Sequence, residues 1–271
     1  MTSRTSVTRS DIARALRGAG LRPGDRVLLH SSLSSMGWVE GGADAVIDAF
    51  LDVLDPRQGT LMVPTFGLCE GPWDPARVPS STGRITETLR LRPQAIRSIH
   101  PSHSVAAIGR DAARLTAGHL EAEANGVGSP IDRLAQSGGY VLLLGVGHDR
   151  NTTIHTAEVY AGAPYVRLPS YPEFFSPRPV RLPNGHVVPK AYSEPPGCSR
   201  GFGVVEGPLH EKGVVVDFFL GTARCQLMKG KALIDAVGQM IRHQPDVLLC
   251  PHADCWCCTT RRAFVLGMQG S

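Results

Sequence analysis

Apolar residues recur at helical spacing in several short segments of the chain, and continuous apolar runs separate these segments. Residues 8–19 place Ile12 and Leu16 on one face and are followed by Gly20, which is typical of an amphipathic helix that ends there. The run 26–30 has the composition of a short buried strand. The same patterns predict helices at 43–54, 86–91, 111–117 and 231–242, and strands at 60–63, 104–108 and 141–144.

Alternation of strands and helices is typical of an α/β fold with a largely parallel central sheet flanked by helices. Two proline-rich stretches, 70–82 and 163–196, predict long loop or hairpin insertions, and a Cys-rich tail ends the chain. Functional loops of α/β folds leave the carboxyl ends of the strands, so both stretches are candidates to border a substrate cleft. Flexible surface connections fit the second stretch equally well. We expect a single domain over 1–271, with 163–271 as its substrate-side subregion.

Composition and charge narrow the class of protein. The 271 residues are 42% hydrophobic and 19% charged, as in ordinary globular proteins. The net charge of +4 is scattered along the chain, so nucleic acid is not an expected partner. No apolar run reaches membrane-spanning length, and the polar start lacks the pattern of a secretion leader. We therefore expect a soluble cytoplasmic protein without a membrane partner, and the sequence leaves a homodimer open.

The segment 141–160 has the pattern of a strand, a turn and a helix. Its apolar run 141–144 is typical of a fully buried strand, and Gly145 and Gly147 allow a tight turn after it. Asn151 or Thr152 can cap the helix that follows. The segment therefore predicts that the helix begins where a central strand ends.

His155 and Glu158 are the candidate catalytic pair on this helix. Three residues apart, they share one face, so the carboxylate can orient the imidazole. The positive end of the helix dipole favours the neutral imidazole, which can accept a proton. An ordinary structural His–Glu pair is the alternative interpretation. A dinucleotide-binding turn is a further one, but Arg150 stands where that motif needs its third glycine.

Several motifs occur in the order that one enzyme family shows. They are His30-Ser31-Ser32-Leu33 with Gly37, the run 59–66, His100-Pro101 followed by 104–107, Gly128-Ser129-Pro130, and Leu143-Leu144-Gly145 leading to 151–155 with Glu158. Together they resemble the aminoglycoside N3-acetyltransferases, which belong to the antibiotic N-acetyltransferase superfamily and are unlike the GNAT enzymes. The resemblance runs from about Asp11 to the cysteine cluster, and several motifs in order are more specific than any one alone.

The resemblance implies an acyltransferase that passes acetyl directly from acetyl-CoA to the 3-N amine of an aminoglycoside, as in antibiotic resistance. His155 would be its general base and Glu158 the partner of that base. The chemistry agrees, because an ammonium is not a nucleophile and must lose a proton as it attacks the thioester. No covalent intermediate is required, so Cys69 is expected to be structural. A non-catalytic binding protein of the same fold would have no chemical need for the pair.

The turn 30–35 is the candidate site for the cosubstrate. It follows a strand and offers hydroxyls and backbone amides, which suit the pantetheine and phosphate groups of coenzyme A. Serine-rich turns are common, so the turn alone does not predict a ligand. By the resemblance, the expected contacts are Ser31, Ser32 and Leu33, with Ser98, Ser104 and Thr153 as further candidates. His103 is expected either in the cleft or in solvent.

Four of the seven cysteines fall between Cys250 and Cys258, and this grouping favours a metal site or reduced thiols over a disulfide framework. Cys255 and Cys258 form a CxxC pair, which can supply half of a tetrahedral zinc site. The pattern resembles one branch of the family, in which such a tail pairs with an upstream cysteine. The expected ligands of a structural zinc are Cys198, Cys250, Cys255 and Cys258, with His252 or Cys257 as substitutes. Buried free thiols are the alternative.

The charges in the predicted loops do not settle which amine is the substrate. A cleft for a polycationic aminoglycoside should be lined with carboxylates. The acids available in the loops are Glu40, Glu70, Asp74, Glu121, Glu123 and Glu173. The long second loop, however, also carries Arg167, Arg178 and Arg181. A biosynthetic N-acetyltransferase acting on another amine, anionic or nucleotide-linked, is therefore the alternative function.

Overall fold

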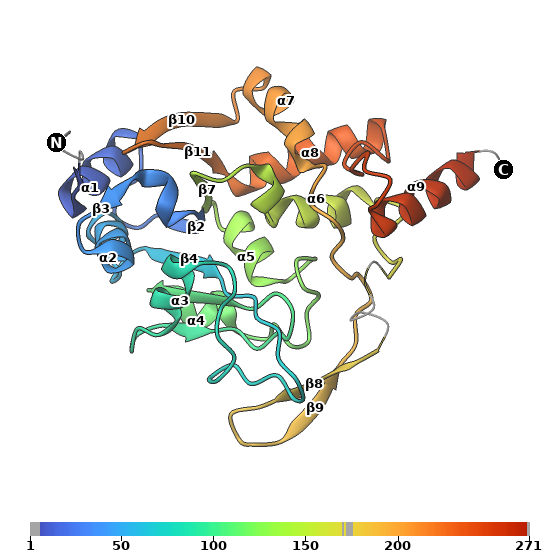
Figure 1. Ribbon diagram of the computed structural model, residues 1–271, viewed down its shortest axis with the longest axis horizontal. Helices are drawn as coiled ribbons and strands as arrows, with labels where there is room; N and C mark the ends of the chain where they lie inside the picture. The colour runs from blue at the N-terminus through green and yellow to red at the C-terminus, as the bar shows by residue number, and fades with distance from the viewer. Residues whose placement is uncertain (1–5, 170, 172–175, 270–271) are drawn as a thin grey trace.

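The structure is a computed structural model, and it describes residues 6–169, 171 and 176–269. A seven-stranded sheet runs through it in the order β10-β11-β7-β2-β4-β6-β5 (Figure 1). The strands of this sheet are β2 (Arg26–Ser31), β4 (Thr60–Pro64), β5 (Ile96–Arg97), β6 (Val105–Gly109), β7 (Tyr140–Leu144), β10 (Val215–Leu220) and β11 (Ala223–Lys229). Two small sheets pair β1 (Ser6–Val7) with β3 (Trp38–Val39), and β8 (Arg178–Arg181) with β9 (Val187–Lys190).

Only the centre of the main sheet is parallel. β2 pairs in parallel with both β4 and β7, whereas the other four pairings are antiparallel. The predicted α/β class with a central sheet flanked by helices is confirmed, but its parallel part is confined to three strands. Connection length explains one of the antiparallel pairings, β10 with β11. A helical crossover joins β2 to β4, while Gly221 and Thr222 alone join β10 to β11 and permit only a hairpin.

Helices cover both faces of the sheet. One face packs against α1 (Arg9–Gly18), α2 (Gly42–Leu54) and α3 (Arg84–Arg90). The other packs against α4 (Ala112–Thr116), α5 (Pro130–Gln136), α6 (Thr153–Ala161) and α8 (Gly230–His243). Successive residues of a strand point to opposite faces, so Val27 and Leu29 enter the first core and Leu28 the second. Among the helices that the structure describes, none combines the length and apolarity needed to cross a membrane.

The hydrophobic periodicity predicted the central elements well and the flanking ones poorly. Every helix and strand expected from it is present, with ends within two residues of the expected ones. The elements it missed include the short strands β1, β3 and β5, the helices α5, α7 (Glu206–Glu211) and α9 (Trp256–Gln269), and the β10–β11 hairpin. Helix α9 was missed because its buried side chains include cysteines of the predicted metal cluster, which were counted as ligands rather than as an apolar face.

The two proline-rich stretches pack against each other. The backbone NH of Trp73 donates to the Pro179 carbonyl, and that of Arg181 donates to the Trp73 carbonyl, both at 2.8 Å. Trp73, Val78 and Val180 bury their side chains in a small core of their own. The β8–β9 hairpin projects to the lower edge of the view in Figure 1. A predicted hairpin insertion is therefore present, and its described part is anchored rather than loose.

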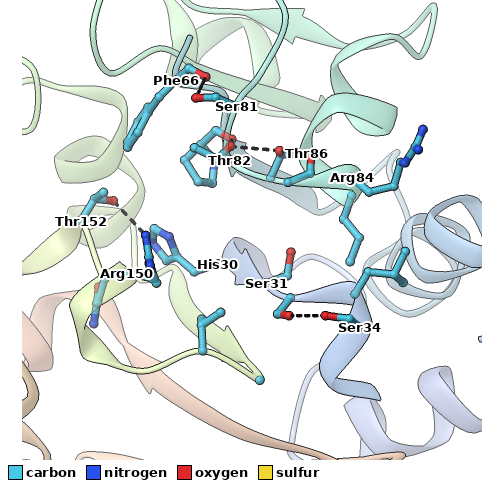
Figure 2. Close-up of a pocket in the computed structure, with 18 of the residues that line it drawn as sticks. His30, Ser31, Ser34, Phe66, Ser81, Thr82, Arg84, Thr86, Arg150 and Thr152 are labelled. Atoms are coloured by element: carbon cyan, nitrogen blue, oxygen red, sulfur yellow. Dashed lines mark hydrogen bonds between the residues drawn. The ribbon is translucent and has the colours of Figure 1, made fainter. Parts of the chain in front are cut away.

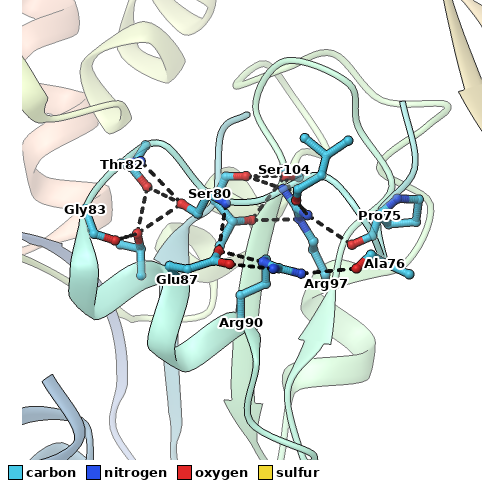
Figure 3. A network of polar contacts seen from close by, with 12 residues as sticks. Pro75, Ala76, Ser80, Thr82, Gly83, Glu87, Arg90, Arg97 and Ser104 are labelled. Atoms are coloured by element: carbon cyan, nitrogen blue, oxygen red, sulfur yellow. Dashed lines mark hydrogen bonds and ion pairs between the residues drawn. The ribbon is translucent and has the colours of Figure 1, made fainter. Parts of the chain in front are cut away.

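Arg97 fastens the loop between β4 and α3 to the sheet (Figure 3). Its guanidinium donates to the carbonyls of Thr65, Pro75 and Val78 and lies 4.9 Å from the centre of the Trp73 ring. Burial lowers the pKa of Arg97 to about 10, so the group stays charged at neutral pH. The partly buried guanidinium thus donates to three loop carbonyls, one of which, that of Thr65, also accepts from the Ser104 hydroxyl.

We expect Arg97→Met to lower the free energy of unfolding by about 3 kcal/mol, because methionine cannot donate to the three loop carbonyls and those of Pro75 and Val78 lose the Arg97 donor. Chemical denaturation measures the change. Arg77→Met is the matched control, since that side chain is 88% exposed and forms one distant ion pair with Asp74. Equal denaturation midpoints for the two variants would contradict the anchoring role.

Candidate active site

A cavity of about 1310 Å³ opens where the three parallel strands end. Its walls come from the turns after β2, β4 and β7, from the start of α3 and from the start of α6. The carboxyl ends of parallel strands meet at one edge of a sheet, which is where α/β folds bind ligands. Figure 2 shows His30, Ser31 and Ser34 on one side of this space and Phe66, Thr82 and Arg84 on others. The cavity is therefore the candidate active site.

His155 and Glu158 meet in the first turns of α6, as their spacing predicts. The imidazole Nδ1 lies 2.6 Å from Glu158 Oε2, and both side chains are buried. His155 lines the cavity, whereas Glu158 does not. An ionised carboxylate only accepts hydrogen bonds, so Nδ1 donates the proton and Nε2 is left with the lone pair. The pair can therefore present a proton acceptor to a molecule in the cavity.

Two aromatic side chains hold this pair. The Tyr165 hydroxyl donates to Glu158 Oε1 at 2.9 Å, so that both carboxylate oxygens have a partner. The Phe202 ring meets the His155 imidazole edge-on, with centroids 4.9 Å apart. Neither aromatic was singled out from the sequence, because they lie 7 and 47 residues away from the groups they contact. No local pattern marks such a contact.

Thr152 is the residue in the cap position before α6, but the side chain that bonds to the first NH of the helix is that of Asn151. The Asn151 side-chain oxygen accepts from the backbone NH of Thr153 at 3.2 Å, which is the capping role predicted for one of the two residues. The Thr152 hydroxyl instead lies 3.4 Å from His30 Nε2 at the end of β2. Burial lowers the pKa of His30 to about 3, so this imidazole is neutral. Thr152 and His30 both line the cavity.

The serine turn after β2 forms another wall. Ser31, Ser32 and Leu33, the predicted cosubstrate contacts, all line the cavity. Gly145 packs against this turn with a φ of +63°, and a Cβ on it would meet Ser35 Oγ at 1.8 Å. The glycine is needed here because only a residue without a side chain lets the two turns come this close.

The further cosubstrate candidates lie elsewhere. Ser98, Ser104 and Thr153 are almost fully buried, and none of them lines the cavity. The Ser98 hydroxyl pairs with His119 Nδ1 at 2.8 Å, and that of Ser104 donates to the Thr65 carbonyl at 2.8 Å. Each of these two hydroxyls has an internal partner. The structure therefore does not bring the three residues together with the serine turn.

The charged groups along the cavity were missed by the sequence analysis. Arg84, Arg150 and Asp149 line it, and Asp149 is the one carboxylate among the described lining residues. None of the described acids proposed from the loops lines the cavity, and Glu173 lies outside the described residues. The arginines at 167, 178 and 181 do not line it either. Nothing in the sequence around Arg84 or Asp149 marks them, since segments far apart in the chain assemble this wall.

His103, which the sequence left open, lines the cavity. Its ring packs on Phe66 with centroids 4.4 Å apart. Burial, with the charges of His155 and His119 as smaller effects, holds the pKa of His103 well below its usual range. His103 is thus a neutral group in the cavity wall and adds no positive charge to it.

The four predicted cysteines converge on one point. The sulfurs of Cys198, Cys250, Cys255 and Cys258 all lie within 4.8 Å of one another, and the side chains are buried. The Cys198 and Cys250 sulfurs are 3.9 Å apart. No disulfide joins the described cysteines. Neither of the predicted substitutes, His252 and Cys257, belongs to the group.

Comparison with known proteins gives consistent matches. The family model described as aminoglycoside 3-N-acetyltransferase matches residues 28–242. The aminoglycoside N(3)-acetyltransferase VII of Streptomyces paromomycinus is 40% identical over 187 residues, which cover 61% of this chain and 65% of that protein. The aminoglycoside N(3)-acetyltransferase IV of a Salmonella species is 33% identical over 247 residues, or 90% of each chain. The chain thus spans just under two thirds of the first relative and nearly all of the second.

Solved structures extend the likeness to the whole fold. The apoenzyme of aminoglycoside acetyltransferase AAC(3)-IVa aligns with a TM-score of 0.84 at 30% identity, over 97% of this chain and 99% of that one. A histidine-to-alanine mutant of the same enzyme was solved with gentamicin. AAC-IIIb with CoASH aligns with a TM-score of 0.77 at 25% identity, over 89% and 98% of the two chains. The chain belongs to the aminoglycoside 3-N-acetyltransferase family of acyltransferases.

Proposed function

We propose that this protein transfers an acetyl group from acetyl-CoA to the 3-N amine of an aminoglycoside, with His155 as the general base. The observation that carries the proposal is the buried His155–Glu158 pair, whose imidazole borders a large cavity at the sheet edge. Family membership supports the reaction class. The relative solved with gentamicin and the one solved with CoASH support the two substrates.

In the proposed mechanism, the amine nitrogen attacks the thioester carbonyl while His155 Nε2 accepts its proton. A nitrogen–carbon bond forms, and the carbon–sulfur bond then breaks. The sulfur leaves as a thiolate, which takes the proton from the imidazolium, so that coenzyme A departs as the thiol. Glu158 stabilises the imidazolium through the 2.6 Å contact with Nδ1. The acetyl group never becomes attached to the protein.

For the cosubstrate, we propose the wall formed by Ser31, Ser32 and Leu33. Hydroxyls and backbone amides at the end of a strand suit the pantetheine amides and the phosphates of coenzyme A. Arg84 borders the same space and offers a positive charge to a phosphate (Figure 2). The side of the cavity toward His103 and Phe66 is left for the amine.

One observation favours a different amine. The described lining holds two arginines and a single carboxylate, Asp149, whereas a polycation is best held by several carboxylates. An N-acetyltransferase that acts on an anionic or nucleotide-linked amine, as in a biosynthetic pathway, is therefore the second candidate. The same His155–Glu158 chemistry serves both substrates, so the amine alone distinguishes them.

We also propose that the four cysteines bind one structural zinc ion. Tetrahedral zinc with Zn–S bonds of about 2.3 Å places its sulfurs roughly 3.8 Å apart, which agrees with the 3.9 Å between Cys198 and Cys250. All four sulfurs are close enough to share one ion, and four protein ligands leave no position for a water. The ion would hold the start of α9 to the segments around Cys198 and Cys250.

We expect His155→Ala to lower kcat by about 10³-fold, because the attacking amine loses its proton acceptor. Thiol release from acetyl-CoA measures turnover, and calorimetry should show that coenzyme A still binds. His186→Ala is the control, since His186 is exposed in the β8–β9 turn. Near-normal turnover by the His155 variant would rule out the proposed base.

A panel of amines tests the acceptor. We expect kcat/KM for gentamicin-like and apramycin-like aminoglycosides to exceed that for small anionic amines by about 100-fold or more, a difference in transition-state stabilisation of about 2.7 kcal/mol. Thiol release measures all of them under the same conditions. Turnover confined to the anionic amines would replace the aminoglycoside proposal with the biosynthetic one.

Metal analysis tests the cysteine site. Protein purified without chelator should contain about one zinc per chain, and Cys198→Ser should lose most of it, because a site with three thiolates binds more weakly. Cys69→Ser is the control, as Cys69 lies outside the four-sulfur group. Wild-type protein free of zinc would show that these residues are buried thiols.

A further inference from the structure

We infer that Tyr165 is a positioning residue for the catalytic pair and that Arg261 of helix α9 holds it in place. Tyr165 would fix the Glu158 carboxylate, and through it the orientation of the His155 imidazole. This inference deepens the proposed function, since it concerns the same base. It adds two residues, one of them in the C-terminal helix, to a site otherwise built from strand ends and α6.

The first step of the argument is the contact with Glu158. Glu158 Oε2 is hydrogen-bonded to His155. The carboxylate can still rotate about this bond unless Oε1 also has a hydrogen-bond partner. The Tyr165 hydroxyl holds it at 2.9 Å, and the whole tyrosine is buried. Burial and the Glu158 charge raise the pKa of Tyr165 above its usual range, so the phenol keeps its proton and donates. The second oxygen therefore has a fixed donor.

The second step is how the chain brings Tyr165 to this point. Helix α6 ends at Ala161, and the next residue, Gly162, adopts the left-handed conformation with a φ of +66°. The backbone NH of Ala163 donates back to the Glu158 carbonyl at 3.0 Å, and the chain reverses direction. Tyr165 thereby returns to the face of α6 that carries Glu158. The turn, rather than the helix, positions the hydroxyl.

The third step is the contact with Arg261. Its guanidinium lies 5.2 Å from the centre of the Tyr165 ring and donates to the carbonyls of Leu168 and Pro195, at 3.2 and 3.1 Å. Arg261 is 2% exposed, and Gly197 leaves room for it, because a Cβ there would meet its Nη1 at 2.0 Å. Arg261 thus joins the turn that carries Tyr165 to the segment before Cys198.

The fourth step separates positioning from substrate contact. Neither Tyr165 nor Arg261 lines the large cavity. Arg261 instead borders a second cavity of about 10 Å³, behind the pair, together with Glu194, His155 and Glu158. This space is about the size of one water molecule, far too small for an aminoglycoside. Tyr165 therefore reaches the reaction through Glu158 and His155, whereas Arg261 also packs against Gly197 in the wall of the large cavity.

Tyr165→Phe is the decisive variant, because it removes one hydroxyl and keeps the ring that Arg261 covers. We expect kcat to fall about ten-fold while KM for acetyl-CoA changes less than about two-fold. The acidic limb of the kcat/KM profile should move to higher pH, since the freed charge of Glu158 concentrates on the oxygen that faces His155. A purely structural role would leave that limb in place.

Tyr160→Phe is the matched control. Its hydroxyl also donates to a carboxylate, Asp132 Oδ1 at 3.0 Å, but Tyr160 lies within α6 itself and this bond does not involve Glu158. We expect wild-type kcat and an unchanged pH profile for this variant. If Tyr165→Phe behaved like Tyr160→Phe in both measurements, the inference would be overturned.

A double-mutant cycle tests Arg261. Arg261→Gln should lower kcat about five-fold in the wild type and less than about two-fold in Tyr165→Phe, because both changes release the same carboxylate. Arg262→Gln is the control, because it also removes hydrogen bonds that attach α9 to the rest of the protein. Arg262 donates to the carbonyls of Leu249 and Cys250 and not to the turn that carries Tyr165. Additive effects of Arg261→Gln and Tyr165→Phe would disprove the link.

Histidine NMR keeps this test independent of the substrate proposal. In protein labelled with ¹⁵N-histidine, the Nδ1 proton of His155, assigned by its loss in His155→Ala, should shift in Tyr165→Phe and stay unchanged in Tyr160→Phe. A shift without turnover of any aminoglycoside would support the positioning role and reject the proposed acceptor. An unchanged signal in an active Tyr165→Phe enzyme would reject the positioning role alone.

Discussion

The hydrogen bond between His155 and Glu158 is the interaction on which the candidate site depends. A carboxylate that is buried this deeply is costly unless its oxygens are hydrogen-bonded. His155 Nδ1 and the Tyr165 hydroxyl occupy one oxygen each, at 2.6 and 2.9 Å. This arrangement leaves the imidazole Nε2 free to face the cavity. Helix α6 holds this pair beside the cavity where β2, β4 and β7 end.

The cavity lies at the end of the three parallel strands in the centre of the sheet. β2, β4 and β7 end together, so the turns after them form one cavity wall. Segments distant in the chain complete the structure around the pair. Phe202 follows Cys198 and packs on His155, while Arg261 follows Cys258 and packs on Tyr165. Each of the two contacting residues thus lies within four residues of a cysteine of the cluster.

The charges of the cavity bear on the acceptor amine. Burial keeps His30 and His103 neutral, so the charged residues in its described lining are Arg84 and the ion pair of Arg150 with Asp149. Arginines suit the phosphates of coenzyme A. A single carboxylate gives limited electrostatic attraction for a polycation. The proposed proton transfer is the same for an aminoglycoside and for an anionic amine.

The sequence by itself determined the central helices and strands and the contacts within them. Helical periodicity and the three-residue spacing of His155 and Glu158 act over one or two turns, so they can be predicted without a fold. The motifs from His30 to Glu158 also identified the family. Only the tertiary structure decided the antiparallel flanks, the cavity wall at Arg84 and Asp149, and the contacts of Tyr165, Phe202 and Arg261. These depend on packing between segments far apart in the chain, which no local pattern of residues records.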